Sequence, residues 1–226
     1  MKSGRKSQVD EQIFYRQVGS FDKLPKPVEL YTVLSQYLLH ITATGLSGLS
    51  YCCEKSPFEE FTVKTLVIMR HAKSSWKELG LSDHDRPLNK RGRDDAPKMG
   101  RLLRNKKLKP ELIISSGAKR ARETLKHVIE ACGYKQEIRI SEALYAAGPE
   151  AYIKLLRELD DGYDRVMVVG HNPGLEELLE VLTKEEHILP TAALVWVELP
   201  IRRWRELDYS VIGELIDLWR PRQLPE

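Results

Sequence analysis

The sequence predicts an α/β fold, a three-layer sandwich in which helices cover both faces of a mainly parallel central sheet, preceded by an N-terminal extension. From about residue 62 onward, short apolar runs alternate with amphipathic segments of helical length. Such alternation is typical of strands that are joined by crossover helices. The chain has 226 residues, of which 42% are hydrophobic and 31% charged, so it can build the core of one domain.

Residues 1–62 lack this alternation and are predicted to be an extension, whereas residues 63–222 form the domain. Residues 30–53 contain no charged side chain, but their Ser, Thr, Gln and His residues weigh against a transmembrane helix. Three interpretations stay open: a tail, a targeting segment, or an amphipathic helix over residues 28–41 that packs on the domain or on a membrane. Contact of residues 28–53 with a membrane is less favoured than the other interpretations.

Six runs in the domain have the pattern of a strand. They cover residues 63–69, 112–114, 137–140, 165–170, 194–199 and 204–209. The runs VKTLVIM and RVMVVG are almost continuously apolar and β-branched, as strands buried on both faces require. The runs EIRI, LVWVEL and WRELDY alternate between apolar and polar residues, which is a strand pattern.

Helices are predicted between these strands. They cover residues 92–106, 118–131, 149–159 and 174–182. Pro97 lies inside the first of them, so this helix either starts near Pro97 or is kinked there, because proline has no amide hydrogen to donate. Gly133 ends the second helix, and Pro173 precedes the fourth, both in positions that these residues favour.

Composition excludes several classes of protein. The 36 basic and 33 acidic residues give a net charge of +3, without the basic excess of a nucleic-acid-binding protein. Three cysteines cannot form a disulfide framework, and no secretory signal opens the sequence. We therefore expect a cytoplasmic protein, or one in an organelle such as a plastid if residues 1–62 are a targeting segment. The sequence does not indicate an oligomeric state.

Basic side chains gather at the predicted ends of strands. Arg70 and His71 directly follow the first strand, and His171 directly follows the fourth. Ligands of parallel sheets bind at these carboxyl ends, so the two histidines are expected to face one pocket. Arg86 precedes a proline in a loop, and Arg120 lies in the first turn of a helix, where anions are favoured. The sharper hypothesis is that all three arginines converge on one anion with both histidines.

Such a cluster suits phosphoryl transfer. Guanidinium groups bind the non-bridging oxygens with paired hydrogen bonds, and a neutral imidazole, with a pKa of about 6.5, is a good nucleophile near neutral pH. Attack would give a phosphohistidine that water hydrolyses. No cofactor or metal is predicted, because positive side chains can carry the charge. His84 with Asp83 and Asp85 resembles a ligand trio, but adjacent residues of an extended chain point in opposite directions.

At this point the sequence resembles the histidine phosphatase superfamily, which has a phosphoglycerate mutase-like fold. The Arg-His-Gly signature of that family reads Arg70-His71-Ala72 here. Within the family the resemblance is strongest to SixA-type phosphohistidine phosphatases, in which RHAKS is a common variant. Further similar segments are residues 82–103, 114–125, 142–159, 166–179 and 189–200.

The resemblance implies a role for each site residue. His71 would accept the phosphoryl group, and His171 would complete the pocket and stabilise charge. The phosphoryl ligands would be Arg70, Arg86 and Arg120. Glu142 is the nearest candidate for a general acid, although compact members often lack a clear equivalent. The implied activity is a metal-independent phosphatase that acts on phosphohistidine in proteins.

Two alternatives remain beside that interpretation. The same mechanism could serve a phosphatase of small phosphorylated metabolites, and the same pocket could belong to a phosphate- or phosphoprotein-binding module without catalysis. The segment between Arg120 and His171 is short, so no long insertion is expected to cap the pocket. An open pocket favours a phosphoryl group that is carried by a protein.

Overall fold

The computed structural model describes residues 63–77 and 80–224. They belong to one of the two units into which the chain divides, Glu59–Glu226. The predicted extension, residues 1–62, lies outside the described residues, and with it the interpretations of residues 28–53. Within the described ranges, no helix is both long enough and apolar enough to cross a membrane.

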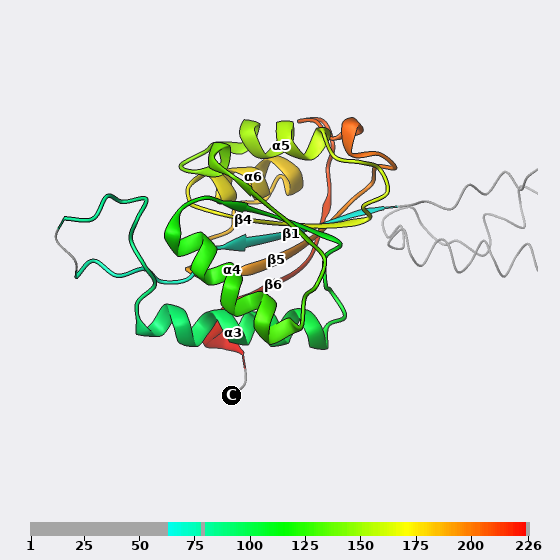
Figure 1. Ribbon diagram of the computed structural model, residues 1–226. Coiled ribbons are helices and arrows are strands. Elements are labelled where there is room, and N and C mark those ends of the chain that lie inside the picture. The colour runs from blue at the N-terminus through cyan, green and yellow to red at the C-terminus, as the bar shows by residue number, and fades with distance from the viewer. Residues whose placement is uncertain (1–62, 78–79, 225–226) are drawn as a thin grey trace, which may run out of the picture. The chain divides into compact units, whose positions relative to one another are not determined.

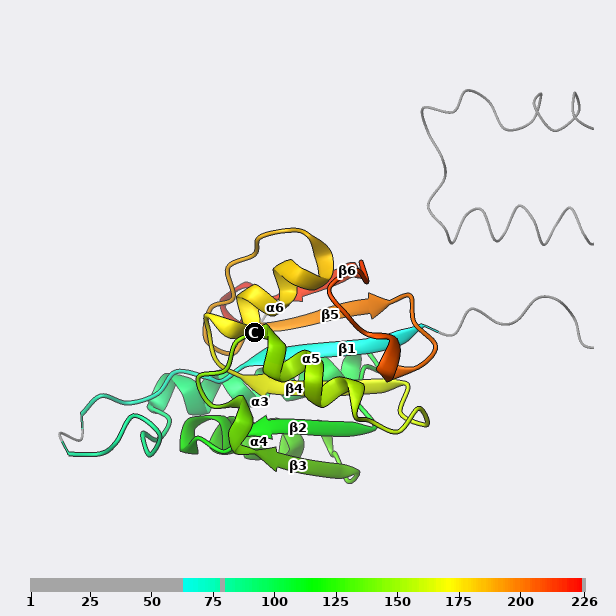
Figure 2. The same cartoon turned by 90° about the horizontal axis from the view of Figure 1, so that it is seen from above.

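The described residues form a six-stranded sheet in the order β3-β2-β4-β1-β5-β6. The strands are β1 Lys64–Arg70, β2 Leu112–Ser116, β3 Glu137–Ser141, β4 Arg165–Gly170, β5 Leu194–Leu199 and β6 Glu214–Trp219. The four strands from β3 to β1 run parallel, whereas β5 is antiparallel to β1 and to β6. Figure 2 shows this order from one edge to the other. The predicted mainly parallel sheet is confirmed.

Helices cover both faces of the sheet. They are α3 Lys90–Asn105, α4 Lys119–Cys132, α5 Pro149–Arg157 and α6 Gly174–Thr183, with short 3-10 helices η1 Glu142–Leu144, η2 Trp204–Glu206 and η3 Pro221–Gln223. Helices α3 and α4 lie on one face, and α5 and α6 on the other (Figure 1). Val67 and Met69 of β1 pack in the core on the side of α3 and α4. Leu66 and Ile68 pack in the core on the side of α5 and α6. The predicted three-layer sandwich is therefore confirmed.

The prediction of a strand over residues 204–209 is wrong. This segment contains the 3-10 helix η2, and the last strand is β6, Glu214–Trp219, which the sequence analysis missed. Trp204 is fully buried, and its indole Nε1 donates to the carbonyl of Tyr163 at 2.7 Å. The Glu206 carboxylate accepts from the backbone amide of Arg203 at 3.3 Å and from Arg203 Nε at 2.7 Å. The alternating apolar residues of this segment, Trp204 and Leu207, are therefore buried side chains of a turn and not one face of a strand.

Helix α3 begins at Lys90, so the alternative that placed its start near Pro97 is wrong. The Asn89 side chain accepts a hydrogen bond from the backbone amide of Gly92 at 2.9 Å. Asparagine is among the residues that favour this capping position. The helix continues through Pro97, because buried residues on both sides of the proline, Ala96 before it and Met99 and Leu103 after it, pack on the sheet.

Candidate active site

The two predicted histidines meet where β1 and β4 end. These strands are parallel neighbours, with Arg70 opposite Gly170, and each histidine directly follows its strand. The backbone amide of His71 donates to the carbonyl of Gly170 at 3.0 Å, which extends the pairing by one step. The ring centroids of His71 and His171 lie 4.9 Å apart, with an interplanar angle of 52°.

The imidazole of His71 is held in one tautomer. Its Nδ1 lies 2.7 Å from the carbonyl oxygen of Ala72, which can only accept, so Nδ1 carries the proton. Nε2 is then a lone-pair acceptor, and Arg120 Nε donates to it at 3.3 Å. Burial lowers the pKa of His71 to about 3, an effect that the Ala72 bond opposes and the neighbouring His171 and arginines reinforce. The imidazole is therefore uncharged at neutral pH, which is the state that attack by Nε2 would require.

Ala72 stands where the family signature has glycine, and the structure accommodates it. Its φ is not positive, so an alanine is not strained there. Its backbone amide donates to Thr124 Oγ1 at 2.9 Å, and that hydroxyl donates in turn to the carbonyl of Arg120 at 2.6 Å. Thr124 thus links the residue after His71 to helix α4.

His171 is positioned by a residue that sequence reasoning missed. Its Nε2 lies 2.8 Å from the hydroxyl of Ser116, at the end of β2, while its Nδ1 is buried with no partner among the described residues. Burial lowers the pKa of His171 to about 4, and Arg120 adds to this shift. If the Ser116 hydroxyl donates to Nε2, then Nδ1 carries the proton of the neutral imidazole.

Arg86 and Arg120 converge on one carboxylate. Arg86 Nη1 donates to Asp83 Oδ1 at 2.7 Å, and Arg120 Nη2 donates to Asp83 Oδ2 at 2.9 Å. Arg120 lies in the first turn of α4. Arg86 also donates to Ser74 Oγ at 2.8 Å, and its guanidinium stacks 3.2 Å from the ring centroid of Trp76.

Tyr145 and Asp83 complete this cluster and were not predicted as site residues. The Tyr145 hydroxyl donates to Asp83 Oδ2 at 2.9 Å, and its ring meets that of His171 edge to face at 5.7 Å. Burial raises the pKa of Asp83, but the hydrogen bonds from Arg86, Tyr145 and Arg120 outweigh it and lower that pKa to about 2. Asp83 is therefore an anion throughout the neutral range.

Arg70 is anchored away from Asp83. Its Nη1 donates to the carbonyl of Leu189 at 2.6 Å, and its Nε is buried without a partner among the described residues. Asn172 Nδ2 donates to the same carbonyl at 3.0 Å, and its Oδ1 is likewise unpartnered within that part of the chain. Burial lowers the pKa of Arg70, and the charge of Glu176 opposes that shift. Arg70 lowers the pKa values of both histidines, so its charge acts on the same site.

Glu142 lies outside this cluster. Its carboxylate contacts His84 Nε2 at 3.1 Å and passes close to Gly117, where a Cβ atom would collide with it. The hydrogen bonds of the described residues do not join it to either histidine of the site. A role for Glu142 as general acid therefore stays a prediction.

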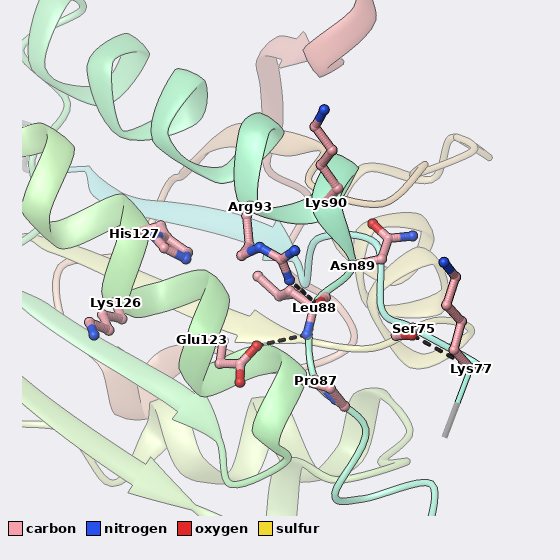
Figure 3. A pocket seen from close by; sticks show the side chains of 10 residues that line it. All are labelled: Ser75, Lys77, Pro87, Leu88, Asn89, Lys90, Arg93, Glu123, Lys126 and His127. Atoms are coloured by element: carbon pink, nitrogen blue, oxygen red, sulfur yellow. Dashed lines mark hydrogen bonds between the residues drawn. The ribbon is translucent and has the colours of Figure 1, made fainter. Parts of the chain in front are cut away.

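Two hollows lie beside the site, and neither contains the two histidines. The larger, of about 550 Å³, lies between the loop that precedes α3 and helix α4 (Figure 3). Its basic side chains are Lys77, Lys90, Arg93, Lys126 and His127, against one carboxylate, that of Glu123. The second hollow, of about 360 Å³, shares Glu123 and Lys126 with the first. The surface next to the site is therefore largely positive.

Comparison with known sequences connects this site to a family. A sequence model of the histidine phosphatase superfamily, branch 1, matches residues 66–146. An uncharacterised chloroplastic protein of Arabidopsis thaliana is 34% identical over 152 residues, which cover 63% of this chain and 70% of that protein. An uncharacterised protein of Mycobacterium leprae is 36% identical over 166 residues, which cover 68% of this chain and all of that protein.

Solved structures give the same result. A chain from Agrobacterium tumefaciens that carries the name phosphohistidine phosphatase SixA has 29% identity and a TM-score of 0.61, over 70% of this chain and 98% of that one. A protein histidine phosphatase SixA complexed with tungstate has 25% identity and the same TM-score, over 71% and 99% of the two chains. The chain belongs to the histidine phosphatase superfamily, in which it is similar to the SixA phosphohistidine phosphatases.

Proposed function

We propose that this protein is a phosphatase that takes the phosphoryl group onto His71 Nε2, and that its substrate is phosphohistidine carried by a protein. The observation that carries the proposal is the state of His71. Its imidazole is buried and uncharged, its Nε2 lone pair faces the guanidinium of Arg120, and His171 lies beside it. Membership of the superfamily supports phosphatase chemistry by a histidine.

The proposed reaction has two steps. In the first, Nε2 of His71 attacks phosphorus, the bond from phosphorus to the leaving nitrogen breaks, and that nitrogen takes up a proton. In the second, water attacks the same phosphorus, and inorganic phosphate leaves as His71 returns to its neutral form. Arg120 and the neighbouring arginines would stabilise the charge that develops on the non-bridging oxygens. An imidazole leaving group is readily protonated near neutral pH, so Glu142 need not act as an acid.

His171 would act as a hydrogen-bond donor to the phosphoryl group. Its Nδ1, which has no partner among the described residues, would supply the proton when Ser116 donates to Nε2. A donor that is already oriented before the substrate binds needs no reorganisation as charge develops. The SixA structure complexed with tungstate supports an oxyanion ligand for this fold, because tungstate resembles phosphate in shape and charge.

The test is phosphate release from a phosphohistidine-bearing protein by the purified chain, without added metal. We expect turnover that disappears in the His71→Ala variant, together with a phosphoenzyme that forms only in the unmodified chain. A small phosphate ester is assayed beside it, because the relative rates separate a protein phosphatase from a metabolite phosphatase. Phosphate binding without turnover on either substrate would instead favour a binding module.

The compartment is a separate proposal. The Arabidopsis relative is named a chloroplastic protein, and we propose an organelle such as a plastid as the alternative to the cytoplasm for this chain. A fluorescent protein fused behind residues 1–62 and expressed in the cells of origin would distinguish the two locations. Diffuse fluorescence would favour the cytoplasm.

A further inference from the structure

The Asp83 carboxylate lies where an anionic ligand of Arg86 and Arg120 is expected. Each of its oxygens accepts a short hydrogen bond from a different guanidinium, at 2.7 and 2.9 Å. A phosphoryl group offers the same guanidinium groups the same kind of acceptor, two oxygens on one central atom. A carboxylate and a phosphoryl group cannot occupy these donor positions together without repelling each other.

The exposure of the three side chains shows which one can move. The side chains of Arg86 and Arg120 are only 9% and 8% exposed, whereas that of Asp83 is 49% exposed. The backbone carbonyl of Asp83 accepts a separate bond from Arg120 Nη1, which the carboxylate does not supply. A rotation of the exposed carboxylate into solvent would therefore free Nη1 of Arg86 and Nη2 of Arg120.

The two guanidinium groups are held by other contacts as well. Arg86 donates to Ser75 O at 3.0 Å and to Ser74 Oγ at 2.8 Å. Arg120 is fixed by His71 Nε2 and by the backbone of Asp83. The Asp83 carboxylate is thus not needed to place the arginines, and its charge opposes the binding of a second anion between them.

We propose that Asp83 is an internal anion that occupies the phosphoryl-binding guanidinium groups of the free protein and is displaced when a phosphoryl group binds. The proposal rests on the phosphate site proposed above. If the carboxylate must be displaced, the site is selective for ligands that make further contacts with the protein besides those of the phosphoryl group. Inorganic phosphate, the product, must displace the carboxylate without the help of contacts to the rest of a substrate.

The test is the affinity of the Asp83→Asn variant for inorganic phosphate, measured by calorimetry. Asparagine keeps the size of the side chain and removes its charge. We expect phosphate to bind about three- to tenfold more tightly, which is the effect of losing one or two partly exposed ion pairs that oppose it. In steady-state assays, the KM for a phosphate ester should fall with little change in kcat.

Asp85→Asn is the matched control. Asp85 lies two residues further along the same loop and carries the same charge, but its oxygens contact Ser82 and His84 and neither arginine. Its variant should bind inorganic phosphate as the unmodified protein does. An Asp83→Ala variant, checked by thermal unfolding, repeats the measurement without any side-chain amide.

Two results would overturn the proposal. Weaker phosphate binding in both Asp83 variants would mean that Asp83 positions the arginines for the ligand. An equal gain in the Asp83 and Asp85 variants would mean that only net charge matters. Because phosphate binding is measured without turnover, either result is independent of whether the protein proves to be a phosphohistidine phosphatase. The measurement to make first is therefore the calorimetric comparison of Asp83→Asn with Asp85→Asn.

Discussion

At the scale of single residues, the site keeps two imidazoles uncharged beside three arginines. Burial alone disfavours the imidazolium form, and the nearby guanidinium charges add to the effect. The Ala72 carbonyl then decides which nitrogen of His71 carries the remaining proton. In the proposed reaction, His71 needs no general base, because its Nε2 already carries no proton.

This state predicts the pH dependence of catalysis. A histidine whose pKa is lowered stays in its neutral form as pH falls through 6.5. This form is lost only as pH approaches the lowered pKa. We therefore expect kcat/KM, corrected for ionisation of the substrate, to stay constant from pH 7 to about pH 5, because this parameter reports the free enzyme. The Arg120→Gln variant should move the acidic limb upward, since one of the charges that lower the pKa of His71 is removed. An acidic limb centred near pH 6.5 in the unmodified protein would contradict the prediction.

At the scale of elements, the N-terminus of α3 fixes the loop that follows the nucleophile. Asn89 N donates to the Lys73 carbonyl at 2.9 Å, and Ser74 forms an antiparallel bridge with Leu88. Gly92 packs so closely against Lys73 that an added Cβ atom would lie 2.3 Å from that carbonyl oxygen. The helix and the loop behind His71 therefore behave as one packed unit.

The packing predicts the effect of Gly92→Ala. Helix propensity alone would favour alanine by about 1 kcal/mol. The clash is with backbone atoms, which cannot turn aside as a side chain can, and overpacking of this kind costs about 1–3 kcal/mol. We expect a net loss in the free energy of unfolding, measured in urea, together with reduced turnover. Arg101→Ala, at an exposed position of the same helix, is the control and should stay within about 0.5 kcal/mol. A more stable Gly92→Ala protein would contradict the prediction, because it would show that the loop at Lys73 can move away from the added Cβ atom.

At the scale of the whole molecule, we expect the positive hollows beside the site to bind the protein substrate that is proposed above. Lys90 lines the larger hollow, and Lys126 lines both. A Lys90→Glu, Lys126→Glu variant should lower kcat/KM for a phosphohistidine protein about tenfold through slower association. A small phosphate ester should be hydrolysed as before.

The control for this variant carries the same change of charge elsewhere. Lys135 and Lys154 are exposed and line neither hollow, so their double replacement by glutamate isolates the effect of net charge. Equal losses in the two double variants, or an equal loss on the small ester, would contradict a docking role of this surface.

How far the sequence predicts the fold depends on burial. Strands β4 and β5 have the predicted bounds, and β1 differs by one residue, because strands in the middle of the sheet need long apolar runs. Strand β6 lies at an edge and is half exposed, so its pattern is weak, whereas the buried Trp204 anchors a turn that imitates a strand.

The site was predictable where it depends on strand ends. The sequence places both histidines after parallel strands, and the structure brings them to 4.9 Å. Asp83, Tyr145 and Ser116 were not predicted as site residues, because their contacts depend on loop conformation and, apart from the bond between Arg86 and Asp83, on partners 37 or more residues away. The only sequence signal for Ser116 was its position at the carboxyl end of β2, the strand that follows α3 and precedes α4.

The pairing of Arg70 with Gly170 has a consequence for how activity is lost under stress. Both histidines are attached to the middle of the sheet, which opens only when the whole domain unfolds. Arg86 instead follows a stretch of mostly exposed residues, 80–85, and such loops open at a much smaller free energy. Mild denaturant should therefore first lower the rate at dilute substrate. The rate at saturating substrate should be affected later, because His71 stays in place.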